Sequence, residues 1–196
     1  MWSVYELKPA FQSLLRPLVG WLAGAGVTAN VVTIAATVLS LGLGAAIVAI
    51  RGAPAVLLML PVLLAVRMGL NAIDGMLARE HGQKSRLGFV LNELGDVISD
   101  AALYLPFVVV LGPIWALPVV LFPIAEFAGV LALALGGERR YDGPMGKSDR
   151  AVVYSLLAVA AATIGVSAGW SLGLALAISG LAVVTMWRRV QRGLHA

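Results

Sequence analysis

The amino-acid sequence predicts an all-α integral membrane protein, in which six transmembrane helices follow an amphipathic helix at the membrane surface. Three observations predict this class. Of the 196 residues 60% are hydrophobic, and the mean hydropathy is +0.94. Only 12% are charged, against about 25% in soluble globular domains. Six segments are also apolar over about the 20 residues that a helix needs to cross a bilayer.

The first predicted element is the amphipathic helix, within residues 1–26. Its apolar residues recur at helical spacing and leave Lys8, Gln12 and Arg16 off their stripe; they are Leu7, Phe11, Leu14, Leu15, Leu18 and Leu22. Such a helix lies on the cytoplasmic leaflet, with a kink expected near Pro17. The alternative, an extension of the first span, conflicts with Pro17 and with the glycines of residues 24–26.

Six spans follow within residues 29–187, and residues 188–196 are predicted as a cytoplasmic tail of the same single domain, 1–196. The predicted spans are Ala29–Ile50, Ala53–Ala78, Gly88–Leu111, Ile114–Leu135, Asp149–Val166 and Trp170–Trp187. The fifth and sixth are the shortest, and the fifth begins with a charged residue. Short links join the first span to the second, the third to the fourth and the fifth to the sixth, whereas residues 79–87 and 136–148 form longer, charged links.

The basic residues predict the orientation. Twelve Lys and Arg fall in the N-terminal segment, the two charged links, the start of the fifth span and the tail, while Arg51 alone falls on the other side. Cytoplasmic segments carry this excess, so both termini are predicted to be cytoplasmic. The tryptophans at positions 2, 170 and 187 fit interfacial anchors.

Composition and motifs exclude several other classes of protein. The chain has no cysteine, which excludes disulfides and thiolate metal sites. Its net charge of +4 does not indicate nucleic-acid binding, because the basic residues lie where membrane topology places them. Residues 141–148 look superficially like a P-loop, but the first glycine is missing and no strand precedes them. His81 is predicted to be a solvated loop residue.

Five of the ten acidic residues fall in the interior of the predicted spans, in addition to Asp149 at the start of the fifth. A charge there costs roughly 2.5–3.5 kcal/mol on insertion scales and needs a partner or a function. The five residues are Asp74, Glu93, Asp96, Asp100 and Glu126. Asn71 and Asp74 lie near the cytoplasmic end of the second span. Asn92, Asp96 and Asp100 follow one face of the third span at steps of four. The two helices are therefore expected to present one cluster of carboxylates and amides.

Carboxylate and amide oxygens from facing helices suit a hard divalent cation such as Mg²⁺. Arg79, Lys84 and Arg86 border the cluster, which favours phosphoryl transfer with a carboxylate as the proton acceptor. From spacing alone, an ion-pair network or a cation-transport site is an equal alternative.

The stretch from Asn71 to Arg79, followed by eight residues and then Gly88 to Asp96, resembles the signature of the CDP-alcohol phosphotransferases, D-x2-D-G-x2-A-R-x8-G-x3-D-x3-D. Six of its eight fixed positions match: Asp74, Gly75, Ala78, Arg79, Gly88 and Asp96. The six-span layout, the amphipathic helix and residues 27–30 are also similar to the family. The resemblance extends to a little-characterised enterobacterial branch of it.

The resemblance implies a transferase that moves a phosphatidyl group from CDP-diacylglycerol to an alcohol and releases CMP. It implies that Asp96 is the catalytic base and that Mg²⁺ or Mn²⁺ binds Asp74 and Asp96. CDP-binding residues carried over from the family are Asn30, Asp74, Gly75, Ala78, Arg79 and Gly88. The family also implies a homodimer in contact with membrane lipids, here in a bacterial cytoplasmic (inner) membrane.

Two positions depart from the signature, because Asn71 and Asn92 stand where the family has its first and third aspartates. Asparagine coordinates through its carbonyl but carries no charge. This predicts weaker metal affinity, a single tight metal ion, recruitment of Glu93 or Asp100 as extra ligands, or lost activity.

Two further sets of charges have predicted roles. Arg67, Asp100 and Glu126 share a depth of about 17 Å from the cytoplasmic helix ends, so Arg67 is predicted to pair with Asp100 or Glu126. Ser148 is the predicted N-cap of the fifth span. There, Lys147 and Arg150, with Arg86 and either Arg139 or Arg140, would hold a phosphate on the acceptor. Equally, these cations could only fix topology and touch anionic lipids.

The sequence thus predicts a metal-dependent CDP-alcohol phosphatidyltransferase, with glycerol 3-phosphate ahead of inositol phosphate as its small polar acceptor. A small ion-coupled transporter is the rival from another class. A non-catalytic relative of the family is the third reading.

Overall fold

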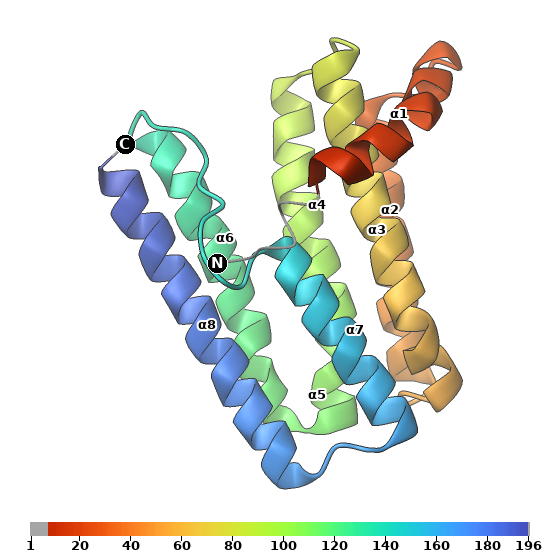
Figure 1. Cartoon of the computed structure of the whole chain (residues 1–196), viewed down its shortest axis with the longest axis vertical. Helices are drawn as coiled ribbons and strands as arrows, with labels where there is room; N and C mark the ends of the chain where they lie inside the picture. Colours follow the sequence, from red (N-terminus) through yellow and green to blue (C-terminus); the bar gives the residue numbers. More distant parts are fainter. Residues whose placement is uncertain (1–7, 196) are drawn as a thin grey trace.

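The computed structural model describes residues 8–195, and over that range every regular element is helical (Figure 1). The predicted anchor Trp2 and the first stripe residue Leu7 lie outside the described residues. In chain order the elements are α1 (Lys8–Gly24), α2 (Ala29–Ala49), α3 (Pro54–Glu80), α4 (Arg86–Tyr104), α5 (Pro106–Leu111), the short 3₁₀ helix η2 (Pro113–Trp115), α6 (Ala116–Ala134), α7 (Lys147–Thr163) and α8 (Ala168–Leu194).

Among the described residues, five helical segments are long and apolar enough to cross a membrane. They are α2, α3, α4 with α5, η2 with α6, and α8. The predicted class, an integral membrane α protein, is confirmed. The predicted fifth span corresponds to α7, which has 17 residues. At 1.5 Å per residue it is about 25 Å long, short of the roughly 30 Å hydrocarbon core, so a sixth crossing stays a prediction.

The helix boundaries follow from local chemistry. The Thr28 hydroxyl accepts the Val31 amide at 3.3 Å and caps α2, and the Ser85 hydroxyl accepts the Gly88 amide at 2.9 Å and caps α4. Pro106 lacks an N–H, which separates α5 from α4. Leu105 between them keeps right-handed helical dihedrals, so the predicted third span continues in the same direction.

One predicted helix boundary is wrong, and the last helix is longer than the predicted span. The N-cap of α7 is Gly146, not Ser148, because the Asp149 carboxylate accepts the Gly146 amide at 3.0 Å. The predicted tail is also helical: α8 runs on to Leu194 and buries Arg189. A segment rich in arginine is expected to be solvated. Here, however, Arg189 contacts the Glu126 carboxylate and the Ala125 carbonyl oxygen of α6.

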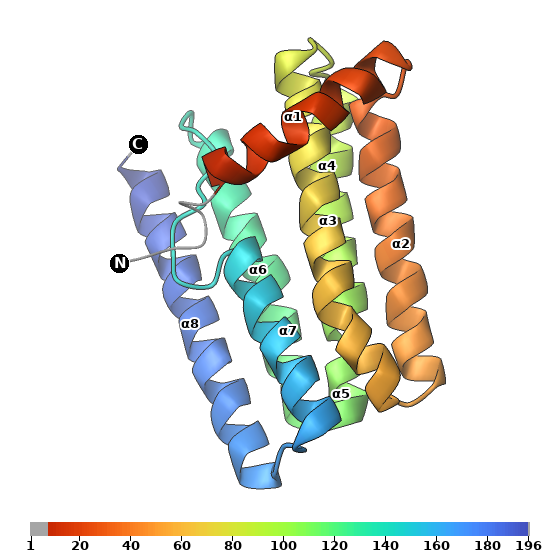
Figure 2. The ribbon, with the colours of Figure 1, turned by 45° about the vertical axis from the view of Figure 1, so that its right-hand side comes forward.

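Helix α1 lies across the ends of α3 and α4 rather than along them (Figure 2). Val19 is fully buried, and Leu15 and Leu22 pack with it against α3. Leu14 and Trp21 point away and are 78% and 67% exposed. One apolar face therefore holds the bundle, and the other is available to lipid, as expected for an interfacial helix.

The main apolar core lies toward the end of the bundle opposite α1, where the links 50–53, 112 and 164–167 gather (Figure 1). Five aromatic rings pack there, from Tyr104, Phe107, Trp115, Phe122 and Tyr154. The Trp115 indole donates to the Ser171 hydroxyl at 2.9 Å. Between this core and α1 the interior becomes polar, and the predicted site lies in that polar part.

Candidate active site

Helices α3 and α4 bring the two halves of the signature together, as predicted. The Asn71 amide on α3 donates to Asp96 Oδ1 on α4 at 2.7 Å. Asp74, almost one helical turn further along α3, is 4% exposed and Asp96 is 6% exposed. Asn92 lies half-buried one turn before Asp96 on α4. Asn71, Asp74 and Asp96 therefore lie together in one buried polar site, with Asn92 one helical turn away on α4.

Asp74 is held from a third helix. The Thr33 hydroxyl on α2 donates to Asp74 Oδ2 at 2.7 Å, and Thr33 is itself buried. Sequence reasoning missed this residue, because a threonine in an apolar span is an ordinary component of helix packing in membranes. The contact fixes one carboxylate oxygen of Asp74 toward α2.

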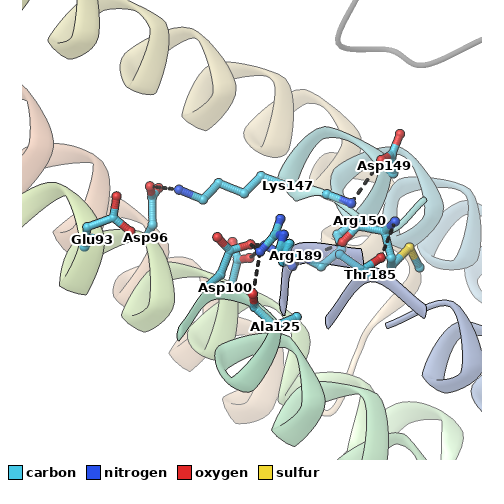
Figure 3. Close-up of polar contacts among 12 residues, drawn as sticks. Glu93, Asp96, Asp100, Ala125, Lys147, Asp149, Arg150, Thr185 and Arg189 are labelled. Atoms are coloured by element: carbon cyan, nitrogen blue, oxygen red, sulfur yellow. Dashed lines mark hydrogen bonds and ion pairs between the residues drawn. The ribbon is translucent and has the colours of Figure 1, made fainter. Parts of the chain in front are cut away.

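Asp96 meets two cations as well as Asn71. Its Oδ2 pairs with the ammonium of Lys147, the first residue of α7, whose side chain extends across the site in Figure 3. Arg67 Nη2 lies 3.4 Å from Asp96 Oδ1 and donates to the Asp96 carbonyl oxygen at 3.2 Å. Contacts from α3 and α7 thus surround the predicted base.

A deeper network of ion pairs continues from Asp96 to Glu126 on α6. Arg67 pairs with Asp100 at 2.7 Å, which confirms one of the two partners predicted for it. Arg150 pairs with Asp100 at 2.8 Å (Figure 3) and with Glu126 at 2.7 Å, and so bridges the two carboxylates. Arg189 on α8 lies 3.3 Å from the same Glu126 oxygen. All of these groups are at most 4% exposed.

Arg139, from the segment between α6 and α7, closes the network. It pairs with Glu93 at 2.6 Å and Glu126 at 2.8 Å, and its guanidinium lies 4.2 Å from the centre of the Tyr141 ring. Burial lowers the pKa of Arg139, but its hydrogen bond to Glu93 and the charge of Glu126 outweigh burial and raise it above the ordinary value. Glu93 and Asp100, predicted as extra metal ligands, therefore already have arginine partners.

The signature glycines explain how two predicted CDP-binding side chains are placed. A Cβ added at Gly75 would lie 3.1 Å from both terminal nitrogens of Arg79, so the guanidinium folds back over the glycine. A Cβ at Gly88 would lie 2.9 Å from Asn30 Oδ1, which brings the start of α2 against α4. Ala78 is half-buried beside the exposed Arg79.

Some of the predicted acceptor residues come together and others do not. Arg139, Lys147 and Arg150 all join the network around Asp96, Asp100 and Glu126. Arg86 is exposed at the start of α4, about 15 Å along the helix axis from Asp96. Arg140 pairs with Asp142 at 3.0 Å.

Arg189 is the second residue of the site, after Thr33, whose position was not predicted from the sequence. It is 1% exposed and donates to the carbonyl oxygens of Ala125 at 2.6 Å and Asp142 at 3.1 Å. A signal was available: Ala182, Thr185 and Arg189 recur at helical spacing, and all three lie on the buried face of α8.

The candidate metal ligands are the oxygen donors around Asp74 and Asp96. Within residues 8–195, no three His, Cys, Asp or Glu side chains are grouped as a metal site. Two buried carboxylates, Asp74 and Asp96, nevertheless lie at the site with the amide of Asn71, and Asn92 is one helical turn from Asp96. The ammonium of Lys147 already contacts Asp96. Oxygen donors that attract a cation fit a hard ion such as Mg²⁺ or Mn²⁺.

Comparison with known proteins gives consistent findings. The sequence profile described as CDP-alcohol phosphatidyltransferase matches residues 26–188. The inner membrane protein YnbA of Escherichia coli K12 is 48% identical over 163 residues, which are 82% of this chain and 81% of that protein.

Solved structures share the fold. The phosphatidylinositol phosphate synthase PgsA1 of Mycobacterium tuberculosis with CDP-DAG bound superposes with a TM-score of 0.73 at 21% identity, over 90% of this chain and 92% of that one. The same synthase in complex with manganese and citrate gives a TM-score of 0.72 at 21% identity, over 91% and 88% of the two chains.

Proposed function

The chain belongs to the CDP-alcohol phosphatidyltransferase family, and from that premise we propose that it transfers a phosphatidyl group from CDP-diacylglycerol to an alcohol and releases CMP. The observation that carries the proposal is the meeting of Asn71 and Asp74 on α3 with Asp96 on α4 in one buried site. A relative of the same fold is described with CDP-DAG bound, and that relative is also described with manganese.

In the proposed reaction the acceptor oxygen attacks the phosphorus that carries the diacylglycerol. A new oxygen–phosphorus bond forms, the bond from that phosphorus to the CMP oxygen breaks, and CMP leaves with the electron pair. Asp96 accepts the proton of the acceptor hydroxyl. Arg67 and Asn71 orient the Asp96 carboxylate, since both contact its Oδ1.

The diphosphate of the donor is proposed to lie beside Arg79 and Gly75, near the C-terminal end of α3. Arg79, folded over Gly75, contacts its oxygens, and Asn30, Ala78 and Gly88 line the approach of the cytidine. Asp74, Asp96, Asn71 and Asn92 would hold Mg²⁺ or Mn²⁺, which supplies charge neutralisation on the phosphates when bound.

The acceptor is proposed to enter beside Lys147, the first residue of α7, and Arg139, in the segment between α6 and α7. Glycerol 3-phosphate is the first acceptor to test and inositol phosphate the second, because Arg139, Lys147 and Arg150 are gathered there. Each of these cations already has a carboxylate partner. An acceptor phosphate would therefore exchange with those carboxylates, and an uncharged alcohol is the alternative.

The proposed setting is a bacterial cytoplasmic membrane, with both termini cytoplasmic and α7 as a sixth crossing. The lipid donor enters the site laterally, and the water-soluble acceptor enters from the cytoplasm. The working form is proposed to be a homodimer.

The test is CMP release from CDP-diacylglycerol by the purified protein with Mg²⁺ or Mn²⁺, across a panel of alcohols. We expect CMP release that requires one alcohol and falls by about 10²-fold or more in Asp96→Asn, as for loss of a general base. Glu138→Gln, at an exposed position, is the matched control and should keep full activity.

Two other results would count against the proposal. Binding of CDP-diacylglycerol without CMP release across the panel would favour a non-catalytic relative. Ion flux into vesicles without either binding or release would favour the transporter.

A further inference from the structure

We infer that the site holds one divalent metal ion rather than two, and that the ammonium of Lys147 is its second positive charge. The inference deepens the proposed function and rests on it for the identity of the site. It concerns how this chain compensates for asparagine at positions 71 and 92.

The first step is the contact between Asn71 and Asp96. Two carboxylates at these positions would repel each other and would need a cation between them. Here the Asn71 amide donates directly to Asp96 Oδ1 at 2.7 Å. A hydrogen bond of normal length thus joins the two side chains without any ion, and Oδ1 of Asp96 is engaged.

The second step is the other oxygen of Asp96, which pairs with Lys147. The Lys147 side chain is 19% exposed and the Asp96 side chain is 7% exposed. The ion pair is therefore largely out of water and weakly screened. Lys147 begins α7 behind the N-cap Gly146. Its backbone is therefore fixed, which tethers the ammonium at the site.

The third step is charge balance. Arg67 also approaches Asp96 Oδ1, at 3.4 Å, so both oxygens of this carboxylate already face cations. Asp74 is the only other signature carboxylate, and Asn92 adds an uncharged oxygen. One divalent ion between Asp74 and Asp96, which competes with Lys147 for the Asp96 carboxylate, matches this donor set. A second ion would meet no further signature carboxylate.

The experiment counts Mn²⁺ bound per chain by the full-length protein in detergent, without substrate, from the EPR signal of free Mn²⁺. We expect one Mn²⁺ per chain in the wild type. Lys147→Met should bind Mn²⁺ about tenfold more tightly or better, because a charge-assisted contact that competes for Asp96 is lost. Lys147→Arg keeps the charge and should stay near the wild type.

A gain-of-site variant tests the count itself. Asn71→Asp, Asn92→Asp and Lys147→Met together should bind two Mn²⁺ per chain. Lys84→Met, at an exposed position in the link before α4, is the control and should leave both the count and the affinity unchanged. Circular dichroism of each variant separates loss of fold from loss of binding.

Two Mn²⁺ or none in the wild type would overturn the inference, as would unchanged Mn²⁺ affinity in a folded Lys147→Met. Because the Mn²⁺ count is made without substrate, it tests the inference about the metal independently of the proposed transferase activity. CMP release with two bound Mn²⁺ rejects only the inference. One Mn²⁺ with the expected Lys147 dependence, but no CMP release, rejects only the transferase.

Discussion

Glu126 joins three guanidinium groups that come from different parts of the chain. Arg150, Arg139 and Arg189 all lie within 3.3 Å of its carboxylate oxygens. The carboxylate is 3% exposed, so water cannot take over if it is removed. Removing one partner from a buried ion pair is strongly destabilising because a charge is left uncompensated.

Glu126→Gln is therefore expected to lower the stability of the fold by about 3–5 kcal/mol. For a chain of this length that corresponds to a fall in Tm of roughly 6–20 °C. Thermal unfolding in detergent, followed by circular dichroism, measures it. Glu138→Gln at an exposed position should leave Tm almost unchanged, and equal Tm values for the two variants would contradict the structural role of Glu126.

The Arg79 guanidinium lies over Gly75 and leaves little room for a side chain at that position. Gly75→Ala would place a methyl group 3.1 Å from the terminal nitrogens of Arg79, and the flexible guanidinium would have to move. If Arg79 contacts the donor diphosphate, KM for CDP-diacylglycerol should rise about 5-fold, equivalent to about 1 kcal/mol, with kcat less affected. Steady-state CMP release measures both constants.

The control for that variant is Gly173→Ala on α8, where an added Cβ meets no atom within 4 Å. It should leave KM unchanged. A Gly75→Ala enzyme with wild-type KM would show that the position of Arg79 over Gly75 does not matter for donor binding.

Individual site residues differ in how far the sequence could predict them. Asn71 and Asp96 were predicted to meet because their spacing from the link of residues 79–87 puts them at matching depths on two successive helices. The Lys147–Asp96 and Arg189–Glu126 pairs join residues 51 and 63 positions apart. Such pairs depend on how α7 and α8 pack, which helical periodicity alone does not give.

Between elements, the tightest approach is that of α2 and α4 at Gly44. A Cβ added there would lie 2.0 Å from the carbonyl oxygen of Ala102, which is backbone and cannot move aside. Gly42, two residues earlier on α2, has no atom within 4 Å of such a Cβ. Small residues allow helices in a membrane to approach closely, and only one of these two glycines serves that purpose.

Gly44→Ala is expected to lower Tm by several degrees, because overpacking costs about 1–3 kcal/mol. Gly42→Ala should raise Tm slightly or leave it unchanged, since alanine is favoured over glycine in a helix by about 1 kcal/mol. Thermal unfolding of the two variants side by side measures the difference. Loss of stability in Gly42→Ala but not Gly44→Ala would show that α2 and α4 are not packed this way.

Helix existence was predictable from the sequence, and helix ends were less so. Apolar segments of about 20 residues gave α2, α3, α6 and α8 within a few residues at most ends. The start of α7 was misplaced because Ser148 matches an N-cap preference, whereas the Asp149 carboxylate accepts the amide of Gly146. A cap depends on which of two neighbouring polar side chains folds back, and spacing does not decide between them.

At the scale of the whole molecule, the segment between α6 and α7 accounts for the short α7. It runs back down beside α6 to reach the start of α7 (Figure 1). The Arg140 amide donates to the Gly129 carbonyl at 3.0 Å and the Met145 amide donates to the Thr185 hydroxyl at 3.0 Å. Gly129 and Thr185 lie several residues inside α6 and α8, so part of this non-helical backbone is hydrogen-bonded to the helices beside it, and Met145 is buried between them. Non-helical backbone is tolerated at membrane depth where protein satisfies its polar groups.

The segment between α6 and α7 and the 17-residue helix α7 would together cross the bilayer. This sixth crossing predicts on which side of the membrane each link between helices lies. The chain has no native cysteine, so single cysteines can report it. We expect Arg51→Cys and Ser167→Cys to react with a membrane-impermeant maleimide on intact spheroplasts. Lys84→Cys and Glu138→Cys should react only after permeabilisation, because their links carry the basic residues that stay cytoplasmic. If α7 does not cross, Ser167→Cys will instead behave like Glu138→Cys, and the C-terminus will lie on the opposite side of the membrane from the N-terminus.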